Sequence, residues 1–328
     1  MRKAALLALI VLIALLIPQN ASAEQTRPLV VTTIAPLAGI VKDAFGNSVQ
    51  VVYLIPAGVD PHDYQLTAEQ INLLSRADII VTTGGHLPVE KKIAELQAEG
   101  TIKGKTLFLD DYKREGFRYL PERWYHGKDN PHGVWLDPTN ALAIARATER
   151  ALEEVDPGNA DVYLRDYNDF QARVNAIVGA YRALVKGNET AVIQMPPDQY
   201  AIEWLGIKAI AAIKPEEEVP AIGVDELLPE AENSSLIVYG VDSPDQLKKA
   251  AFELAEKSGK PIAGVTVFGT DEPYTELLIR NTAALLKALS GGAPVEKPVQ
   301  GPDVGTYVLV SILVGIVLGT AVGVILKK

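Results

Sequence analysis

Short apolar and β-branched runs alternate with amphipathic stretches of helical period along most of the chain. Four such runs lie in the first half, and four more repeat the arrangement in the second half. Because parallel strands need helical crossovers between them, this alternation predicts an α/β protein with two parallel-sheet lobes. The predicted strands cover residues 29–34, 49–55, 78–83 and 105–110, and then 190–194, 209–213, 236–239 and 261–267.

One longer apolar stripe separates the two groups of strands. Its side chains recur at steps of four and three, which places them on one face of an α-helix. The helix is expected over residues 158–187 and would be ~40 Å long at 1.5 Å per residue. We therefore predict a rigid strut that joins a lobe over residues 24–157 to a lobe over residues 188–290. The stripe consists of Tyr163, Tyr167, Phe170, Val174, Ile177, Tyr181 and Leu184.

The two ends of the chain carry long apolar segments. Residues 1–23 have the basic start, apolar middle and Ala-Ser-Ala end of a secretory signal peptide, with an uncleaved anchor as the alternative. Residues 304–326 include enough uncharged positions to cross a hydrocarbon core of ~30 Å as a transmembrane helix. Two lysines follow that segment, so the positive-inside rule places the globular part outside the cytoplasm. We expect a single-pass protein of the cell membrane, with residues 291–303 as a Gly- and Pro-rich tether.

Composition argues against several function classes. The chain has no cysteine, so neither disulfides, nor thiolate chemistry, nor a lipidated N-terminal cysteine is expected. Residues 24–303 hold 27 Lys and Arg against 41 Asp and Glu, a net charge of −14, which disfavours nucleic acid and attracts cations. No H-E-x-x-H motif and no nucleophile elbow are present, so no enzyme is predicted.

The stretch IPAGVDPHDY, residues 55–64, carries the first candidate ligand. It follows a strand and precedes Thr67, which starts a helix through a capping box. His62 therefore lies at the carboxyl end of a strand, the edge where open parallel sheets bind ligands. Asp60 and Asp63 lie beside it, which makes the loop a candidate metal site, with a solvated turn as the alternative.

A second histidine lies in the segment NPHGVWLDPTN, residues 130–140. Asp137 is placed to cap a helix whose first residue is Pro138, so His132 lies in the connection upstream of that cap. Buried neighbours would hold it rigidly, and it could supply a second imidazole opposite the His62 loop. Spacing alone does not show that the two histidines meet.

These segments together resemble the exported solute-binding proteins of zinc and manganese ABC importers, the family called cluster A-I, over residues 28–290. The resemblance rests on VVTTIAPLAGIVKDAFG, IPAGVDPHDYQLT, PHGVWLDPTNA, the long central helix and QYAIEWLGIK. It implies two lobes joined by a rigid helix, with one metal ion between them. In the family, four side chains hold this ion, typically three His, or two His and a Glu, plus a carboxylate. The partner that it implies is an ABC importer permease.

By this resemblance His62 and His132 take the first two ligand positions. The sequence departs from the family at the third, where Met195 replaces His or Glu, and at the fourth, where Thr266 falls at or near the usual Asp. A thioether beside imidazoles would favour Cu(I) over Mn(II), whereas Met195 as ordinary packing is the alternative. His86 is a weaker candidate that could complete a site within the first lobe.

Three further readings stay open at this point. Asp60 and Asp63 could complete the site in place of His86, which could instead cap a helix or lie on the surface. His126 is expected to be exposed and at most a weak capture ligand. We predict an extracytoplasmic binding protein that captures a divalent transition metal for an ABC importer, zinc before manganese and copper. The alternative is a paralogue that has lost the ion and serves as an adhesion or scaffold protein or binds another solute.

Overall fold

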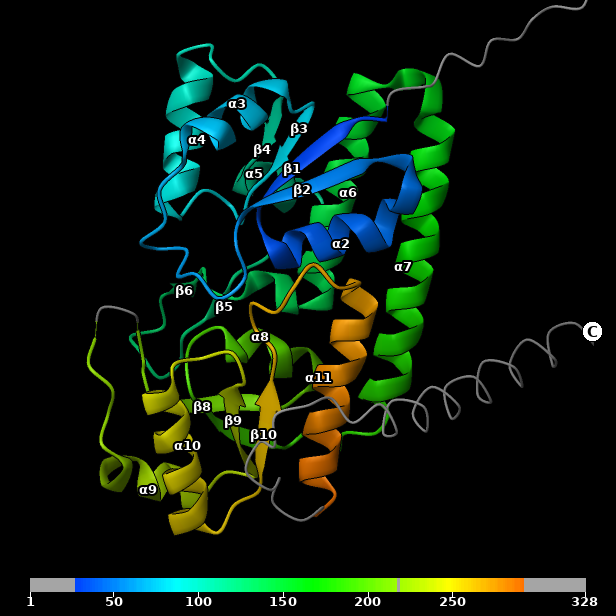
Figure 1. Ribbon diagram of the computed structural model, residues 1–328. Coiled ribbons are helices and arrows are strands. Elements are labelled where there is room, and N and C mark those ends of the chain that lie inside the picture. Colours follow the sequence, from blue (N-terminus) through cyan, green and yellow to red (C-terminus); the bar gives the residue numbers. More distant parts are fainter. Residues whose placement is uncertain (1–26, 217–218, 292–328) are drawn as a thin grey trace, which may run out of the picture. The chain divides into compact units, whose positions relative to one another are not determined.

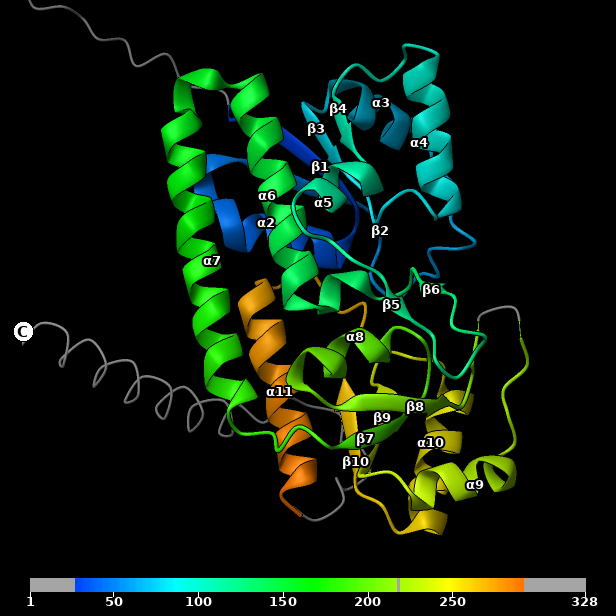
Figure 2. The same ribbon diagram turned by 180° about the vertical axis from the view of Figure 1, so that it is seen from behind.

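The computed structural model describes residues 27–216 and 219–291, and it confirms the two predicted parallel-sheet lobes (Figures 1 and 2). The N-terminal sheet has four parallel strands in the order β2-β1-β3-β4. The elements of this lobe are β1 (Leu29–Ile34), α2 (Ala35–Phe45), β2 (Gln50–Ile55), α3 (Ala68–Arg76), β3 (Ile79–Val81), α4 (Pro88–Ala98), β4 (Lys105–Leu107), α5 (Leu109–Arg114), β5 (Leu120–Pro121), β6 (Asp129–Asn130) and α6 (Pro138–Val155).

The C-terminal sheet also has four parallel strands, in the order β10-β9-β7-β8. All eight predicted strands are present, each within a few residues of the expected bounds. The elements after α6 are α7 (Ala160–Arg182), β7 (Thr190–Ile193), α8 (Asp198–Ile202), β8 (Lys208–Ala212), α9 (Val224–Glu232), β9 (Leu236–Gly240), α10 (Asp245–Ser258), β10 (Ile262–Val265) and α11 (Tyr274–Leu289).

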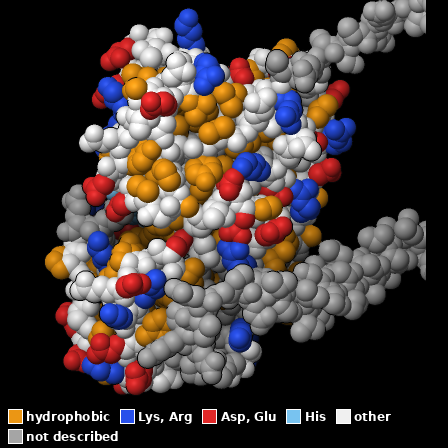
Figure 3. All heavy atoms as spheres, in the orientation of Figure 1, with side chains coloured by type: hydrophobic (Ala, Val, Ile, Leu, Met, Phe, Trp, Pro, Cys, Tyr) orange, Lys and Arg blue, Asp and Glu red, His pale blue; other side chains and the backbone are white. Residues whose placement is uncertain are grey.

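Helices cover both faces of each sheet, which explains why the strands are nearly continuous apolar runs. In the N-terminal lobe α2, α6 and α7 lie on one side of the sheet, and α3 and α4 lie on the other (Figure 1). In the C-terminal lobe α9 and α10 contribute Leu227 and Leu254 to a separate apolar cluster. The opposite side, with α8 and α11, belongs to a larger cluster that continues into the N-terminal lobe. Over the face in Figure 3, charged side chains of both signs are interspersed, as on an ordinary hydrated surface.

Two helices begin at the capping residues that the sequence predicts. Thr67 caps α3 through the predicted capping box, because its side chain accepts from Gln70 N while the Gln70 side chain accepts from Thr67 N. Asp137 caps α6, and its carboxylate accepts hydrogen bonds from the backbone of Thr139 and Asn140. These two caps end the loops that carry His62 and His132.

The predicted strut is α7, a helix of 23 residues that runs beside both lobes (Figures 1 and 2). Its length is ~34 Å at 1.5 Å per residue, shorter than expected because the helix ends at Arg182. Most of the predicted stripe is buried, but Leu184 lies beyond the helix and is 64% exposed. The stripe therefore packs against the lobes only as far as Tyr181.

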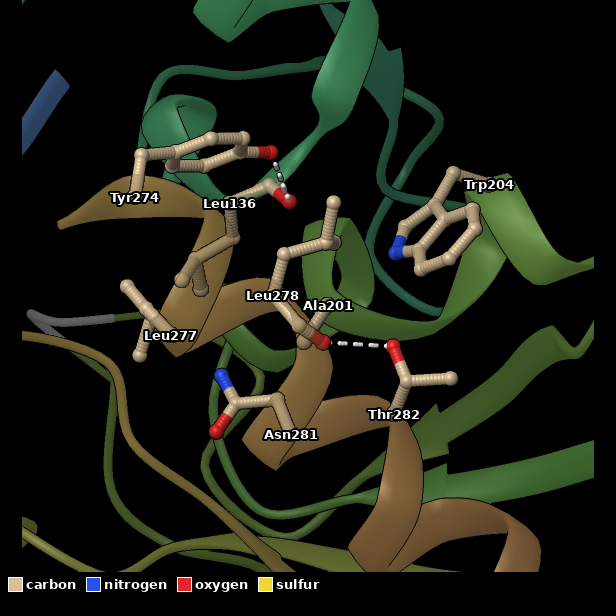
Figure 4. Close-up of a pocket in the computed structure, with 8 residues that line it drawn as sticks. All are labelled: Leu136, Ala201, Trp204, Tyr274, Leu277, Leu278, Asn281 and Thr282. Atoms are coloured by element: carbon tan, nitrogen blue, oxygen red, sulfur yellow. Dashed lines mark hydrogen bonds between the residues drawn. The ribbon is translucent and has the colours of Figure 1, made fainter. Parts of the chain in front are cut away.

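The seam between the lobes is tight. A Cβ atom on Gly39 of α2 would lie 2.3 Å from the backbone oxygen of Glu272, and one on Gly133 would lie 2.6 Å from Pro197 Cα. The Trp135 indole donates a hydrogen bond of 2.8 Å to Val267 O across the same seam. Figure 4 shows a small pocket there, in which Tyr274 of α11 donates to Leu136 O at 3.4 Å.

The predicted transmembrane helix over residues 304–326 lies outside the described residues, as do the signal segment 1–23 and most of the tether 291–303. Within residues 27–216 and 219–291, no helix is both long enough and apolar enough to cross a membrane. The longest, α7, has charged side chains around its exposed faces because only one stripe is buried.

Candidate metal site

Three histidines meet where the N-terminal sheet faces the C-terminal lobe. Each offers one ring nitrogen, and these nitrogens all lie within 4.8 Å of one another. The ring centroids of His132 lie 5.6 Å from those of His62 and His86, which are 6.1 Å apart. A point about 2.8 Å or less from all three nitrogens therefore exists, and small ring rotations would reach the Zn–N length of about 2.0–2.1 Å.

Two of the three loops hold their histidine in the same way. In both, an Asx-Pro-His tripeptide turns the chain, and the Asx side chain accepts a hydrogen bond from the histidine N–H. Asp60 Oδ1 accepts from His62 N at 2.9 Å, and Asn130 Oδ1 accepts from His132 N at 2.9 Å. Proline between them fixes φ, so each turn presents its imidazole in a defined direction.

Asn130 is also anchored to the C-terminal lobe. Its side-chain amide donates to Pro196 O at 2.9 Å and to Gln199 Oε1 at 3.0 Å. Its carbonyl accepts from the Tyr200 hydroxyl at 2.5 Å. The His132 loop is consequently positioned by α8 and by the turn before it.

His86 follows β3 and is oriented through a buried relay. Thr83 Oγ1 donates to Glu90 Oε2 at 2.9 Å, so the same hydroxyl accepts the His86 Nδ1 proton at 3.1 Å. This assigns the proton to Nδ1 and leaves Nε2 unprotonated, the form in which a ring nitrogen binds metal ions. Burial raises the pKa of Glu90, while hydrogen bonds from Thr83, Thr33 and Gly85 act in the opposite direction.

The other candidates from the sequence have different surroundings. Asp60 and Asp63 are exposed and stand apart from the histidine group. Met195 is half-buried after β7, in a turn where its N–H donates to Asp198 at 3.1 Å. Thr266 is tied to α11, since its N–H and C=O both bond to the Asn281 side chain. His126 is exposed, as expected, at a φ of 58° and outside the histidine group.

Two glutamates beside the cluster were not among the predicted site residues. Oε1 of Glu216 lies 3.5 Å from Nε2 of His132. Glu122 is fully buried, and its pKa is raised to about 8, first by burial and then by the neighbouring Glu216 carboxylate. Glu216 is the first of three consecutive glutamates, whose spacing is not that of a known metal-binding motif. Glu122 lies in the β5–β6 hairpin, which the periodicity of the sequence did not predict. The only available signal for Glu216 was its position just after the strand ending near Ile213.

The arrangement suits a transition-metal ion. Neutral imidazoles are the common nitrogen ligands of zinc, copper, iron and nickel, and here the His86 ring is held by Thr83, which lies outside the cluster.

The chain matches a known protein family and several named relatives. The family described as "Zinc-uptake complex component A periplasmic" matches residues 30–288. A zinc-binding lipoprotein of Streptococcus pneumoniae, AdcA, is 23% identical over 82% of this chain and 57% of its own length. A manganese ABC transporter substrate-binding lipoprotein of Streptococcus mitis, PsaA, is 29% identical over 50% of this chain and 54% of its own length. The chain thus spans about half the length of such curated relatives.

Solved structures share the fold. A periplasmic metal-binding protein of Candidatus Liberibacter asiaticus has a TM-score of 0.65 at 19% identity, covering 80% of this chain and all of its own. The binding protein FpvC of Pseudomonas aeruginosa, solved with Mn²⁺, has a TM-score of 0.66 at 20% identity, covering 81% and 100%. At these identities the likeness establishes the architecture.

The relatives also correct the predicted localisation. They are named as lipoproteins, which are held at a membrane by attached lipid in place of a spanning helix. By this comparison the prediction of a single-pass membrane protein is wrong.

The family match covers most of the described residues, and solved structures share the architecture of both lobes. A family of transporter components that bind solutes also agrees with the expectation that the chain is not an enzyme. The chain belongs to the zinc-uptake complex component A family, the metal-binding solute-binding proteins of ABC importers.

Proposed function

We propose that this chain captures a transition-metal ion through His62, His86 and His132 and delivers it to the permease of an ABC importer. The observation that carries the proposal is the convergence of three ring nitrogens within 4.8 Å at one edge of a parallel sheet. Family membership supports the delivery step, because these proteins are the solute-binding components of importers.

Zinc is the ion that the donor set favours. Imidazole suits zinc, whereas manganese prefers sites rich in carboxylate, carbonyl and water oxygens. Relatives are named for zinc and for manganese, so both ions belong in the test. Copper(I) would need the Met195 thioether as a ligand. The Met195 backbone is held in a turn by Asp198.

The test is metal content and affinity of the purified chain. We expect elemental analysis to find close to one zinc ion per chain and calorimetry to rank zinc above manganese, copper(I) and nickel. The double variant His62→Ala, His132→Ala should lose this binding, because a single imidazole remains. The matched control is His126→Ala, which removes the one histidine outside the cluster and should bind like the unchanged chain.

The contrary result is equally clear. If no transition metal binds more tightly than about 0.1 mM, which is near −5.5 kcal/mol, metal capture is rejected. The seam between the lobes would then be tested for another solute or for a scaffold role. Binding that survives in the double variant would place the ion at another site.

A further inference from the structure

The segment after β8 brings an acidic side chain of the C-terminal lobe to the histidines. Oε1 of Glu216 and Nε2 of His132 are 3.5 Å apart, and the two side chains are 24% and 12% exposed. A direct charge-assisted hydrogen bond between such groups would be about 2.7–2.9 Å long. The distance between these two atoms is therefore longer than such a hydrogen bond.

This separation matches that of two ligands of one ion, and because Glu216 is not in the group whose ligand atoms all lie within 4.8 Å of one another, its carboxylate would move toward His62 and His86 on binding. In a tetrahedral zinc site with bonds of about 2.0–2.2 Å, neighbouring ligand atoms lie about 3.4 Å apart. We propose that Glu216 is the fourth ligand, which completes across the two lobes the site begun by the three histidines. The inference rests on the proposed function, since it concerns the same captured ion.

A specific contact holds this segment over the site. The Trp124 indole, in the loop of the β5–β6 hairpin, donates to Pro215 O at 3.1 Å, directly before Glu216. From the other side, Lys214 N donates to Gln194 O at 2.9 Å, which ties the segment to the end of β7. The hairpin that carries Trp124 also leads through Asn130 into the His132 loop. One hairpin therefore positions both His132 and its carboxylate partner.

Glu122 provides an independent sign that a cation belongs here. Its side chain is fully buried, and neither carboxyl oxygen receives a hydrogen bond from an N–H or O–H group of the described residues. Its neighbour is the second acid, Glu216. Two ionised acids this close are costly unless one of them is protonated or a positive charge lies beside them. A metal ion bound by the histidines and Glu216 would supply that charge.

The resulting site has three imidazole nitrogens and one carboxylate oxygen. Such a closed, four-coordinate set suits Zn²⁺ and its spectroscopic substitute Co²⁺ better than Mn²⁺, which favours more oxygen ligands. The fourth ligand comes from the second lobe without using Met195 or Thr266. This would explain how a chain without the usual third and fourth ligands keeps a complete site.

The experiment compares the purified chain with Glu216→Gln and with the control Glu226→Gln, an exposed glutamate of the same lobe. We expect Glu216→Gln to weaken zinc binding by about 10- to 100-fold. Glu226→Gln should leave the zinc affinity unchanged. The visible spectrum of the Co²⁺ form should shift in Glu216→Gln, because a ligand of the ion has changed. Glu216→His should recover most of the zinc affinity.

The outcomes separate this inference from the proposed function. If the unchanged chain binds no zinc, the proposed function fails and the inference with it. If the chain binds zinc but Glu216→Gln keeps the same affinity and Co²⁺ spectrum, only the inference is overturned. A weaker affinity with an unchanged Co²⁺ spectrum also overturns it, since the carboxylate would then act only through its charge. Thermal melting without metal verifies that each variant is folded.

Discussion

At the scale of single residues, the site depends on short polar side chains that precede each histidine. Asp60 and Asn130 accept from the backbone of the histidine two positions later, and Thr83 bonds the His86 ring three positions later. Asp60 and Asn130 hold the backbone of their histidines, and Thr83 holds the ring of His86, so the loops are ordered before an ion binds. Orientation fixed before binding lowers the entropy lost on binding.

The Thr83 hydroxyl can be tested by an isosteric change. Thr83→Val removes the acceptor that holds the His86 Nδ1 proton, and we expect zinc affinity to fall about 10–100-fold. Thr106→Val is the matched control, because the buried Thr106 hydroxyl has no hydrogen-bond partner among the described residues. Calorimetry with zinc would measure both variants. Equal affinities would show that the relay does not position His86.

At the scale of elements, the two lobes are joined at places where their backbones approach each other closely. Gly39 lies in the middle of α2, where glycine is unfavourable by helix propensity. The residue is tolerated there because the chain before α11 passes directly over it, at Glu272. Nearby, Asp43 accepts from Thr275 N and from Arg173 of α7, so three elements join at this end of α2.

Alanine substitutions should have opposite effects at two helical glycines. Gly39→Ala places Cβ against Glu272 O, and we expect the free energy of unfolding to fall by about 1–3 kcal/mol. Gly179→Ala lies on the exposed face of α7 with nothing within 4 Å, and it should raise that free energy by about 0.5–1 kcal/mol. Urea unfolding of both variants measures the two changes in the free energy of unfolding. A stabilising Gly39→Ala would contradict the tight seam.

At the scale of the whole molecule, one apolar cluster runs through both lobes. It contains Val30 and Ile80 of the first sheet together with Ile193 and Val265 of the second. The lobes therefore share a core, and we expect them to unfold together. Asp198, at the start of α8, is fully buried near this junction and accepts from Gln194 N and Met195 N at 3.1 Å.

Asp198 predicts a pH dependence of global stability. Burial raises the pKa of Asp198 to about 8, although the two N–H donors oppose the shift. Because the folded pKa lies above the unfolded value of about 3.9, the neutral form stabilises the fold below pH 4 and this contribution is lost as pH rises to 8.

The variant Asp198→Asn cannot ionise and keeps an acceptor for both N–H groups. From pH 5 to pH 7.5 its free energy of unfolding should rise relative to the unchanged chain, by up to about 1.4 kcal/mol per pH unit. Urea unfolding at both pH values gives the comparison. Parallel pH profiles for the two proteins would mean that Asp198 does not bind the proton in this range.

The sequence alone determined the parts that depend on neighbouring residues. Strands β1 to β4 and β7 to β10 follow from apolar runs, α7 from its stripe, and the starts of α3 and α6 from Thr67 and Asp137. His62 and His132 stood out because each lies in a loop between such elements. These features are encoded within a few positions, so a single sequence reveals them.

Only the tertiary structure decided which side chains meet. The order β2-β1-β3-β4 brings the loops after β2 and β3 to one edge, and so places His86 beside His62. Docking of the second lobe then sets Glu216 opposite His132, more than 80 positions away in the chain. Such contacts arise from strand order and from the shared core, and no local pattern records them. That is why the predicted site centred on His62 and His132, while the structure also brings His86 to them and places Glu216 beside His132.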